Sequence, residues 1–502
     1  MSTQMMETER KYEADVDAVL PDLAGLPEVA SESGLEEIQL EAEYYDTPDL
    51  RLLGAGITLR RRRGGSDEGW HLKLPAGPDT RQELHRPLGR SRVVPAEFAR
   101  LVRVYARTAK LGPVARISTV RRQRVLRDEA GNSLAEVADD TVSAQSMGEV
   151  TTLSQWREIE VELTGGGRRL LEAADARLRD AGLRQPGYSA KLERALAGRR
   201  PAVLARPPAD GRAGEVVLAY LGEQAAALKA QDPQVRRDAP DSVHQMRVAS
   251  RRLRSALQTF REVLPPADTE HLRGELKWLG EVLGAARDAE VLGGHVQDLL
   301  DQLPPDLVLG PVAADVTGQF APRRGAAHRA AVRAMDSPRY LALLDELDAL
   351  LASPPAVDAA AGPGRSLRAD VARAYRRLRK RARQARRLAG GPERDAALHE
   401  MRKAAKRARY AADALTPSAG KPAGRFAAQM KQLQSVLGDH HDTVVARAAI
   451  RDLGVHAHLA GDNAFTYGVL YQLDAGRAGV LSDEAGQVWR EARRKKYRSW
   501  LS

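Results

Sequence analysis

Two acidic stretches of the chain place a charged residue at every second position. Glu7, Glu9 and Lys11 do so near the N-terminus, and Glu158, Glu160 and Glu162 do so in the segment REIEVEL. Successive side chains of a β-strand point to opposite faces, so each stretch predicts a strand with one charged face. Rows of carboxylates suit hard divalent cations such as Mg²⁺ or Mn²⁺. The first chemistry that the sequence suggests is therefore metal binding along a strand.

Cations follow the same spacing in the segments between these stretches. They are Arg60, Arg62, Lys73, Arg122 and Arg124, with Glu83 as a further carboxylate. Such faces are most often the solvated side of a sheet. Two features favour another interpretation: like charges along one strand repel each other, and the acidic and basic strands are segregated. A closed antiparallel barrel lined by both signs explains them better. Its cations would hold a polyanion such as a phosphate chain, and its carboxylates would hold bridging divalent cations.

The third arginine pair depends on a choice of register. Arg116, Arg121, Arg122 and Arg124 crowd one segment, and a slip of one residue exchanges the two faces of a strand. Arg122 and Arg124 share parity with Arg116, so we expect this face to line the barrel.

The elements that position these residues can be read from the same segments. Alternating runs bounded by Gly, Pro or Asp predict strands at 3–11, 38–46, 56–63, 69–75, 80–88, 115–127, 133–143 and 156–164. Helical patterns fill 95–107, 168–182 and 188–198, and almost all of 214–502. Segments rich in Pro interrupt the chain at 200–212 and 353–365. We therefore expect an α+β domain over 1–200, a linker over 201–213 and an all-α domain over 214–502, with halves 214–352 and 366–502.

The motif Glu7-Thr-Glu9-Arg-Lys11 resembles the ExExK signature of the CYTH family, the triphosphate tunnel metalloenzymes. The resemblance covers about residues 1–198 and continues, in family order, through EYYDTPDLRL (43–52), LRRR (59–62), HLKLP (71–75), RQEL (81–84), ADDTV (138–142), WREIEVEL (156–163) and SAKLERAL (189–196). It implies an eight-stranded antiparallel tunnel barrel that hydrolyses triphosphate compounds by metal-assisted attack of water on the terminal phosphoryl group. A few members of the family cyclise ATP, so adenylate cyclase activity is an alternative.

The same resemblance implies a role for each charged residue. Glu7 and Glu9 would ligate Mg²⁺ or Mn²⁺ together with Asp140, Glu158, Glu160 and Glu162. Arg60, Arg62, Arg122 and Arg124 would hold phosphates. The candidate catalytic residues are Glu7, Glu9, Lys11, Lys73, Glu83 and Lys191.

The helical region repeats one pattern twice. SVHQMRVASRRLRSALQTF (242–260) matches ALHEMRKAAKRARYAADAL (397–415), and LKWLGEVLGAARDAEVL (276–292) matches MKQLQSVLGDHHDTVVA (430–446). A residue advances about 100° around a helix, so the cations of each copy form one narrow stripe opposite an apolar one. The stripe residues are His244, Arg247, Arg251 and Arg254 in the first copy and His399, Arg402, Lys406 and Arg409 in the second. Lys277 and Arg287, and then Lys431 and His441, share a face of the matched second helices.

These stripes favour anion binding over an ordinary solvated surface. Solvated helix faces usually mix charges and gain from Glu–Lys pairs, whereas these stripes contain no acid. The alternative for either stripe histidine is a purely structural role. The two matched segments resemble the CHAD domain, a helical domain of two related halves, over about 214–500. That resemblance implies binding of inorganic polyphosphate by the stripe residues.

The composition excludes several kinds of site and indicates the location and the partner of the protein. The chain of 502 residues has no cysteine, which excludes disulfides, a cysteine nucleophile and thiolate metal sites. Its start lacks a secretory signal and no apolar run would span a membrane, so we expect a cytoplasmic protein, with association to polyphosphate granules as a further possibility. Residues 365–409 carry a net charge of +13, more than the +11 of the whole chain. Aromatic residues make up only 4%, which disfavours single-stranded nucleic acid as the partner.

We therefore expect a metal-dependent inorganic triphosphatase with an attached polyphosphate-binding domain. Three alternatives are left open: a polyphosphate-binding protein with an inactive tunnel, an adenylate cyclase, and a nucleic-acid-binding protein acting through residues 365–409. The sequence leaves the preferred triphosphate, the metal and the oligomeric state undetermined.

Overall fold

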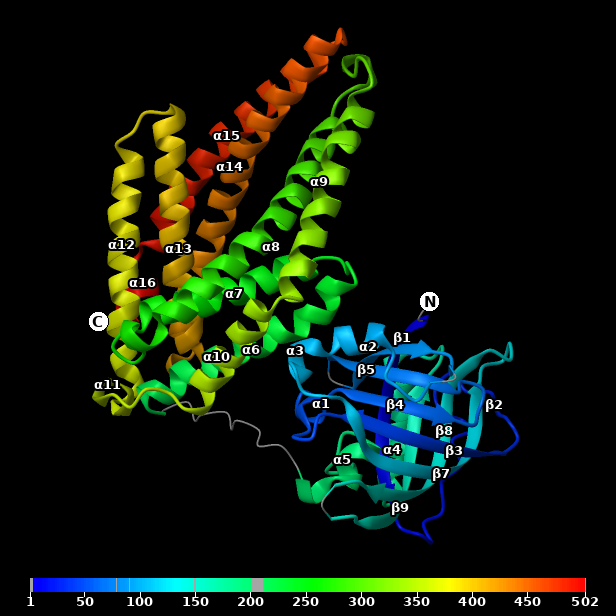
Figure 1. Ribbon diagram of the computed structural model, residues 1–502. Helices are drawn as coiled ribbons and strands as arrows, with labels where there is room; N and C mark the ends of the chain where they lie inside the picture. Colours follow the sequence, from blue (N-terminus) through cyan, green and yellow to red (C-terminus); the bar gives the residue numbers. More distant parts are fainter. Residues whose placement is uncertain (1–2, 78, 90, 149, 200–210, 502) are drawn as a thin grey trace. The chain divides into compact units, whose positions relative to one another are not determined.

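The computed structural model describes residues 3–77, 79–89, 91–148, 150–199 and 211–501 (Figure 1). The chain divides into two compact units, Met1–Leu204 and Ala205–Ser502. The predicted linker, residues 201–213, falls mostly outside the described residues. The last residue of this range, Ala213, contacts the second Pro-rich interruption, since its N–H donates to the Gly362 carbonyl at 2.7 Å.

The first unit is a closed antiparallel barrel of eight strands. The sheet runs β7-β3-β4-β5-β6-β1-β9-β8, and β8 pairs back with β7 to close it. Its strands are β1 Thr3–Ala14, β3 Glu36–Asp46, β4 Thr58–Arg63, β5 Gly69–Gly77, β6 Thr80–Arg86, β7 Gly112–Arg127, β8 Ser133–Ser146 and β9 Leu153–Leu163. The short strand β2, Ser31–Glu32, adds to β7 beyond the end of β3. The eight predicted strands are confirmed, and β2 is an addition to them.

Alternation along the strands separates the lining of the barrel from its outer cores. Ile159 and Val161 of β9 pack outward, together with Leu126 and Val137, against Leu171 and its neighbours in helix α4. Helix α4 is Arg168–Asp180. Short helices α1 Arg51–Gly54, α2 Ala96–Leu101 and α3 Arg103–Ala106 cover another part of the outside, and α5 Lys191–Ala195 packs near one end. Because the apolar face of β9 packs outward, its charged face lines the barrel.

The second unit is all-helical and consists of two four-helix halves (Figure 1). The first half contains α6 Ala213–Arg236, α7 Ser242–Thr259, α8 Pro266–Leu300 and α9 Val312–Met335, followed by α10 Pro338–Ala352 and α11 Asp358–Ala361. The second contains α12 Arg368–Arg386, α13 Gly391–Ala419, α14 Lys421–Ala460 and α15 Phe465–Ala492, followed by α16 Lys495–Arg498.

The two halves pack together in two places. Helix α7 contacts its counterpart α13, and the long hairpins α8–α9 and α14–α15 share one apolar cluster that includes Val296, Phe320, Ile450 and Tyr467. Within the part of the chain that the structure describes, no helix is both long and apolar enough to cross a bilayer.

Candidate functional site

The barrel encloses a cavity of about 930 Å³ to which all eight strands contribute side chains. Its charged lining comes mainly from alternate positions of the strands. The lining includes Glu7, Glu9, Lys11, Arg60, Arg62, Lys73, Arg81, Glu83, Arg121, Glu136, Asp140, Glu160, Glu162 and Lys191. The cations and carboxylates that the sequence separates by more than 100 residues therefore meet in one cavity.

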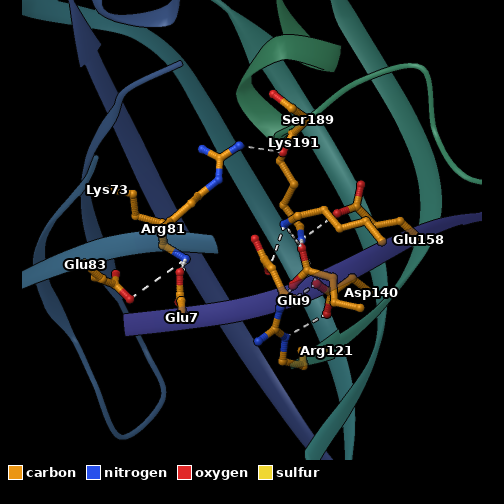
Figure 2. Close-up of polar contacts among 12 residues, drawn as sticks. Glu7, Glu9, Lys73, Arg81, Glu83, Arg121, Asp140, Glu158, Ser189 and Lys191 are labelled. Atoms are coloured by element: carbon orange, nitrogen blue, oxygen red, sulfur yellow. Dashed lines mark hydrogen bonds and ion pairs between the residues drawn. The ribbon is translucent and has the colours of Figure 1, made fainter. Parts of the chain in front are cut away.

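Lys191 is the centre of one group of carboxylates (Figure 2). Its Nζ lies 2.9 Å from Asp140, 2.7 Å from Glu158 and 2.8 Å from Glu160. Arg121 bonds to Asp140 from the other side, at 2.8 and 2.7 Å, and also to Glu160 at 2.7 Å. Lys11 contacts Glu160 as well.

The three nearby cations determine the ionisation state of these carboxylates. Burial alone would raise the pKa of Glu160, but Lys11, Lys191 and Arg121 hold it well below the usual value. Burial likewise opposes the charge of Lys191, but Asp140, Glu158 and Glu160 raise its pKa well above the usual value. The group is therefore a charged network in which the carboxylates fix the lysine ammonium in place.

A second group forms around Lys73 (Figure 2). Its Nζ lies 2.6 Å from Glu7 and 3.8 Å from Glu83. Glu83 is held from behind by the buried ring of His71, whose Nδ1 lies 2.6 Å from the carboxylate. Burial lowers the pKa of His71 to about 3, against the opposing effect of the Glu83 hydrogen bond. The other ring nitrogen, Nε2, lies 2.9 Å from the carbonyl oxygen of Asp67, so the ring is held on both sides. His71 thus orients Glu83 toward the cavity.

Carboxylates crowd together at a third place, across three neighbouring strands. Glu162 lies in register with Glu9 on β1 and with Glu136 on β8. The side-chain carboxylate of Glu162 makes no hydrogen bond or ion pair with any of the described residues. Burial and the nearby Glu7 raise its pKa to about 8, and burial with the nearby Glu83 raises the pKa of Glu7 to about 7. Glu162 and Glu7 therefore lack enough positive charge, whereas Lys11 and Lys73 outweigh burial and lower the pKa of Glu9.

Two arginines of β4 in the same cavity have buried N–H groups without a hydrogen-bond acceptor. The Nε atoms of Arg60 and Arg62 are buried and have no hydrogen-bond acceptor, although Arg60 Nη1 lies 3.3 Å from the Tyr44 hydroxyl and Arg62 pairs with Asp67. Burial, Arg60 and Arg121 lower the pKa of Arg62 to about 9. A buried donor without an acceptor is costly, so these groups are suited to hold an anion.

The structure corrects the register that we predicted for β7. Arg122 and Arg124 lie on the outside of the barrel, where they pair with Glu37 at 3.2 Å and Glu32 at 3.4 Å. Arg121 lines the cavity instead. The physical reason is charge pairing on both faces. Surface acids of β2 and β3 lie next to the outward arginines, whereas the inward Asp140 stands in register with Arg121.

Three other lining residues were missed by the sequence analysis. Arg81 lies two positions before Glu83, and Glu136 four positions before Asp140, so alternation along the strand could have identified both. Tyr44 follows Ala42 on the inward face of β3, but a tyrosine carries no charge that would single it out. Arg81 donates to the carbonyl of Ser189 at 3.1 Å, two residues before Lys191 at the start of α5 (Figure 2).

In the helical unit, the central cations of the two stripes come together. We call Arg247 and Arg251 of α7 with Arg402 and Lys406 of α13 the basic cluster. Burial, Arg402 and Arg251 lower the pKa of Lys406 to about 7, which requires these cations to lie close to each other. Burial also lowers the pKa of Arg251 and Arg402. The cluster is therefore a partly buried concentration of positive charge contributed by both halves.

The predicted histidines flank this cluster in equivalent positions. His399 Nδ1 lies 3.1 Å from His441 Nδ1, and burial followed by His441 lowers the pKa of His399 to about 4. In the first half, burial and the neighbouring Arg287 lower the pKa of His244. Each half thus places a histidine of its first stripe helix beside the matched residue of its second.

The outer ends of the stripes differ from the centre because acids lie beside them. Arg409 lies 3.5 Å from Asp413, and Lys277 lies 3.7 Å from Glu281. Glu281 also lies near Arg254, where it partly opposes the lowering of the Arg254 pKa by burial. Lys431 is exposed and lies near Asp413. Even Arg247 bonds to Asp288 of the next helix, at 2.8 Å. The expectation of stripes without acids is therefore corrected, since neighbouring helices and turns supply them.

The comparisons with known proteins match a different domain family to each of the two units. The model of the CYTH domain matches residues 5–188, and that of the CHAD domain matches residues 219–451. A protein of Mycobacterium tuberculosis, Rv2226, is 40% identical over 490 residues, which is 94% of this chain and 93% of the relative. The chain belongs to the family of proteins that join a CYTH domain to a CHAD domain. CYTH domains are those of triphosphate tunnel enzymes, which are generally metal-dependent.

Solved structures resemble parts of the chain. PptA from Streptomyces chartreusis covers 56% of this chain and 100% of its own, with 23% identity and a TM-score of 0.48. The CHAD domain of the plant Ricinus communis covers 60% of this chain and 95% of its own, with 28% identity and a TM-score of 0.42. HpAC1 from Hippeastrum, a candidate adenylyl cyclase with a dominant triphosphatase activity, covers 39% and 96%, with 16% identity and a TM-score of 0.23.

Proposed function

We propose that the CYTH domain hydrolyses inorganic triphosphate or a related triphosphate compound inside the barrel. The observation that carries this proposal is the pair of buried arginine Nε donors without acceptors, on Arg60 and Arg62. They face a cavity that also contains a group of carboxylates with too little positive charge. A phosphate chain together with a divalent cation would satisfy both at once.

The residues fit a hard divalent cation at one of the two carboxylate groups. The oxygens of Asp140, Glu158 and Glu160 lie within 4.8 Å of one another, but the ammonium of Lys191 already contacts all three residues. The raised pKa values of Glu7 and Glu162 mark the other group as the one that needs a cation. We infer that Glu7, Glu9 and Glu162 would hold Mg²⁺ or Mn²⁺, with Glu136 next in register. Such a cation would neutralise phosphate oxygens and help to orient the attacking water.

The side chains around this site supply the remaining requirements of phosphoryl transfer. Arg60, Arg62 and Lys73 would bind the phosphate oxygens and stabilise the charge that develops as water attacks the terminal phosphorus and the diphosphate leaves. Lys191 and Lys11 are held in the cavity by their carboxylate neighbours, so they are oriented before the substrate arrives. Preorganised charge of this kind avoids reorganisation during the reaction.

We propose further that the CHAD domain binds inorganic polyphosphate at the basic cluster. Its four cations come from two different halves, and burial together with neighbouring cations lowers the pKa values of Lys406, Arg251 and Arg402. A linear polyanion would relieve this repulsion along the whole cluster. The equivalent positions of His244 and His399 beside the cluster would extend the contact on both sides.

A substrate panel tests the proposal. Full-length protein is incubated with tripolyphosphate, long-chain polyphosphate, ATP or thiamine triphosphate, each with Mg²⁺ or Mn²⁺, and released phosphate and cyclic AMP are measured. We expect phosphate release from tripolyphosphate that Glu7→Gln abolishes. Glu13→Gln is the matched control, because Glu13 lies on the same strand but pairs with Arg194.

Four outcomes would contradict parts of this proposal. Full activity of Glu7→Gln would refute the site. Tight polyphosphate binding without turnover of any substrate would leave a binding protein, and cyclic AMP as the main product would make the tunnel a cyclase. Displacement of bound polyphosphate by RNA would argue for a nucleic-acid partner.

A further inference from the structure

A second cavity, of about 1110 Å³, lies on the outer side of the barrel. Helices α2 and α3 form one wall, and the outward residues of β3 with the first residues of β7 form another. None of its lining residues lines the tunnel. It is therefore a separate space, to which the proposed triphosphatase reaction assigns no role.

The charges around this cavity are mostly positive. Its cations are Arg92, Arg100, Arg103, Arg107, Lys110 and Arg199, and its two carboxylates are Glu43 and Asp46. Glu43 is bonded to Arg116 at 2.9 Å. Asp46 accepts backbone N–H groups from Thr47 and Leu52 at 2.7 and 2.9 Å. Both carboxylates are thus engaged elsewhere, and the cavity favours an anionic ligand.

One wall concentrates these cations. Arg100 lies in the last turn of α2, Arg103 begins α3 and Arg107 directly follows α3, and all three line the cavity. Arg107 is buried, and its backbone has a φ of +57° and a ψ of −118°. This conformation is strained for a residue with a Cβ atom, and strain of this kind clusters at ligand sites.

The rest of the cavity is apolar. It is formed by Val93, Val94, Ala96, Ala99, Ala106, Leu111, Pro113, Val114 and Met147. A ligand that only carried phosphates would leave this surface in water, whereas one with an apolar body would bury it, at about 25 cal/mol per Å². The cavity is open to solvent on one side. At this open side, the hydroxyl groups and polar ring atoms of a nucleoside can stay hydrogen-bonded to water, whereas an alkyl chain would expose apolar surface.

We propose that this outer cavity binds a nucleotide, with the base on the apolar surface and the phosphates against the wall formed by Arg100, Arg103 and Arg107. This site is separate from the tunnel and from the basic cluster. It differs from both because it recognises the apolar body of its ligand as well as the phosphates. Phosphate chains without a nucleoside therefore bind it poorly, as do nucleosides without phosphates.

A competition experiment on the full-length protein tests this site. Binding of ATP that carries a fluorescent N-methylanthraniloyl group is followed by anisotropy, in EDTA and with excess tripolyphosphate to saturate the tunnel and the basic cluster. We expect binding that unlabelled ATP displaces and adenosine does not, and the same affinity in the tunnel variant Lys11→Ala. Displacement by adenosine as effective as by ATP, or no binding under these conditions, would overturn the proposal.

Variants of the cavity locate the binding. Ala99→Trp fills the apolar part, and Lys110→Glu reverses an exposed charge at the rim, where a loss of folding is not expected. Each should weaken binding by about tenfold or more. Arg168→Glu is the matched control, because Arg168 is an exposed arginine of the same domain outside the cavity. Unchanged affinity in Lys110→Glu together with Ala99→Trp would place the nucleotide elsewhere and refute the site.

Discussion

The guanidinium of Arg402 lies directly over Gly438, so that a Cβ atom at this glycine would come within 3.0 Å of an Arg402 nitrogen. The first half repeats the arrangement, with Arg247 over Gly284 at 3.3 Å. In both halves the stripe arginine therefore reaches its place in the basic cluster across a glycine of the next helix. The glycine is required by the close approach and by no unusual backbone angle.

Replacing Gly438 by alanine should weaken polyphosphate binding. The added methyl group displaces the Arg402 guanidinium by a few tenths of an ångström or more, and we expect the dissociation constant to rise by about threefold or more. Calorimetry with long-chain polyphosphate measures the change. The control is Gly486→Ala in α15, where a Cβ atom would meet nothing within 4 Å. The control should leave binding unchanged and stabilise its helix by about 1 kcal/mol. Equal affinities in the two variants would contradict the role of Arg402.

Polyphosphate binding should also depend on pH through Lys406. Burial and the neighbouring arginines lower the pKa of this lysine to about 7, so about half of the unliganded molecules carry its charge at neutral pH. A bound polyanion raises the pKa, so binding takes up a proton and affinity falls as the pH rises. Between about pH 6.5 and 8.5 we expect a loss approaching tenfold, measured at constant ionic strength. Lys406→Arg keeps its charge and should remove most of this dependence, whereas an unaltered pH profile would assign it to the histidines.

Alternation along the strands predicts most of the tunnel but leaves one ambiguity that only the folded barrel resolves. Glu7, Glu9 and Lys11 share a face in any register, and so do Glu158, Glu160 and Glu162. The pattern does not say which face is inside. For Arg121 and Arg122 the answer depends on partners in other strands, namely Asp140 inside and Glu37 outside.

Prediction of the helical unit from the sequence meets the same limit. The spacing predicts each cationic stripe, because three- and four-residue intervals are a local property of a helix. That Arg247 and Arg251 meet Arg402 and Lys406 depends on the packing of α7 against α13, which no local pattern encodes. The outer cavity was not predicted either, because its cations near residues 92–110 meet Arg199 and the outward residues of β3 and β7 only in the folded barrel.

The register of β7 can be tested by exchanging two adjacent arginines for methionine. Arg121→Met removes a partner from the buried carboxylates Asp140 and Glu160, so we expect a loss of stability of about 3 kcal/mol and loss of triphosphatase activity. Arg122→Met removes only a surface pair and should change stability by less than about 0.5 kcal/mol. Chemical denaturation and phosphate release measure both effects. A larger loss in Arg122→Met than in Arg121→Met would mean that β7 has the other register, and equal losses would contradict the assignment of Arg121 to the inside.

The carboxylate group around Glu162 should make the stability of the first unit depend on metal. Burial and the nearby Glu7 raise the pKa of Glu162 to about 8, so the folded protein holds a proton that the unfolded chain releases above its ordinary pKa of 4.5. This group therefore lowers stability progressively as the pH rises from about 4.5 to 8. At pH 8 in EDTA, Glu162→Gln should melt at a higher temperature than the unmodified protein, because the amide carries no charge to bury. Mg²⁺ or Mn²⁺ should raise the melting temperature of the unmodified protein and have little effect on Glu162→Gln. An equal metal-dependent shift in both proteins, measured by differential scanning fluorimetry, would move the metal away from Glu162.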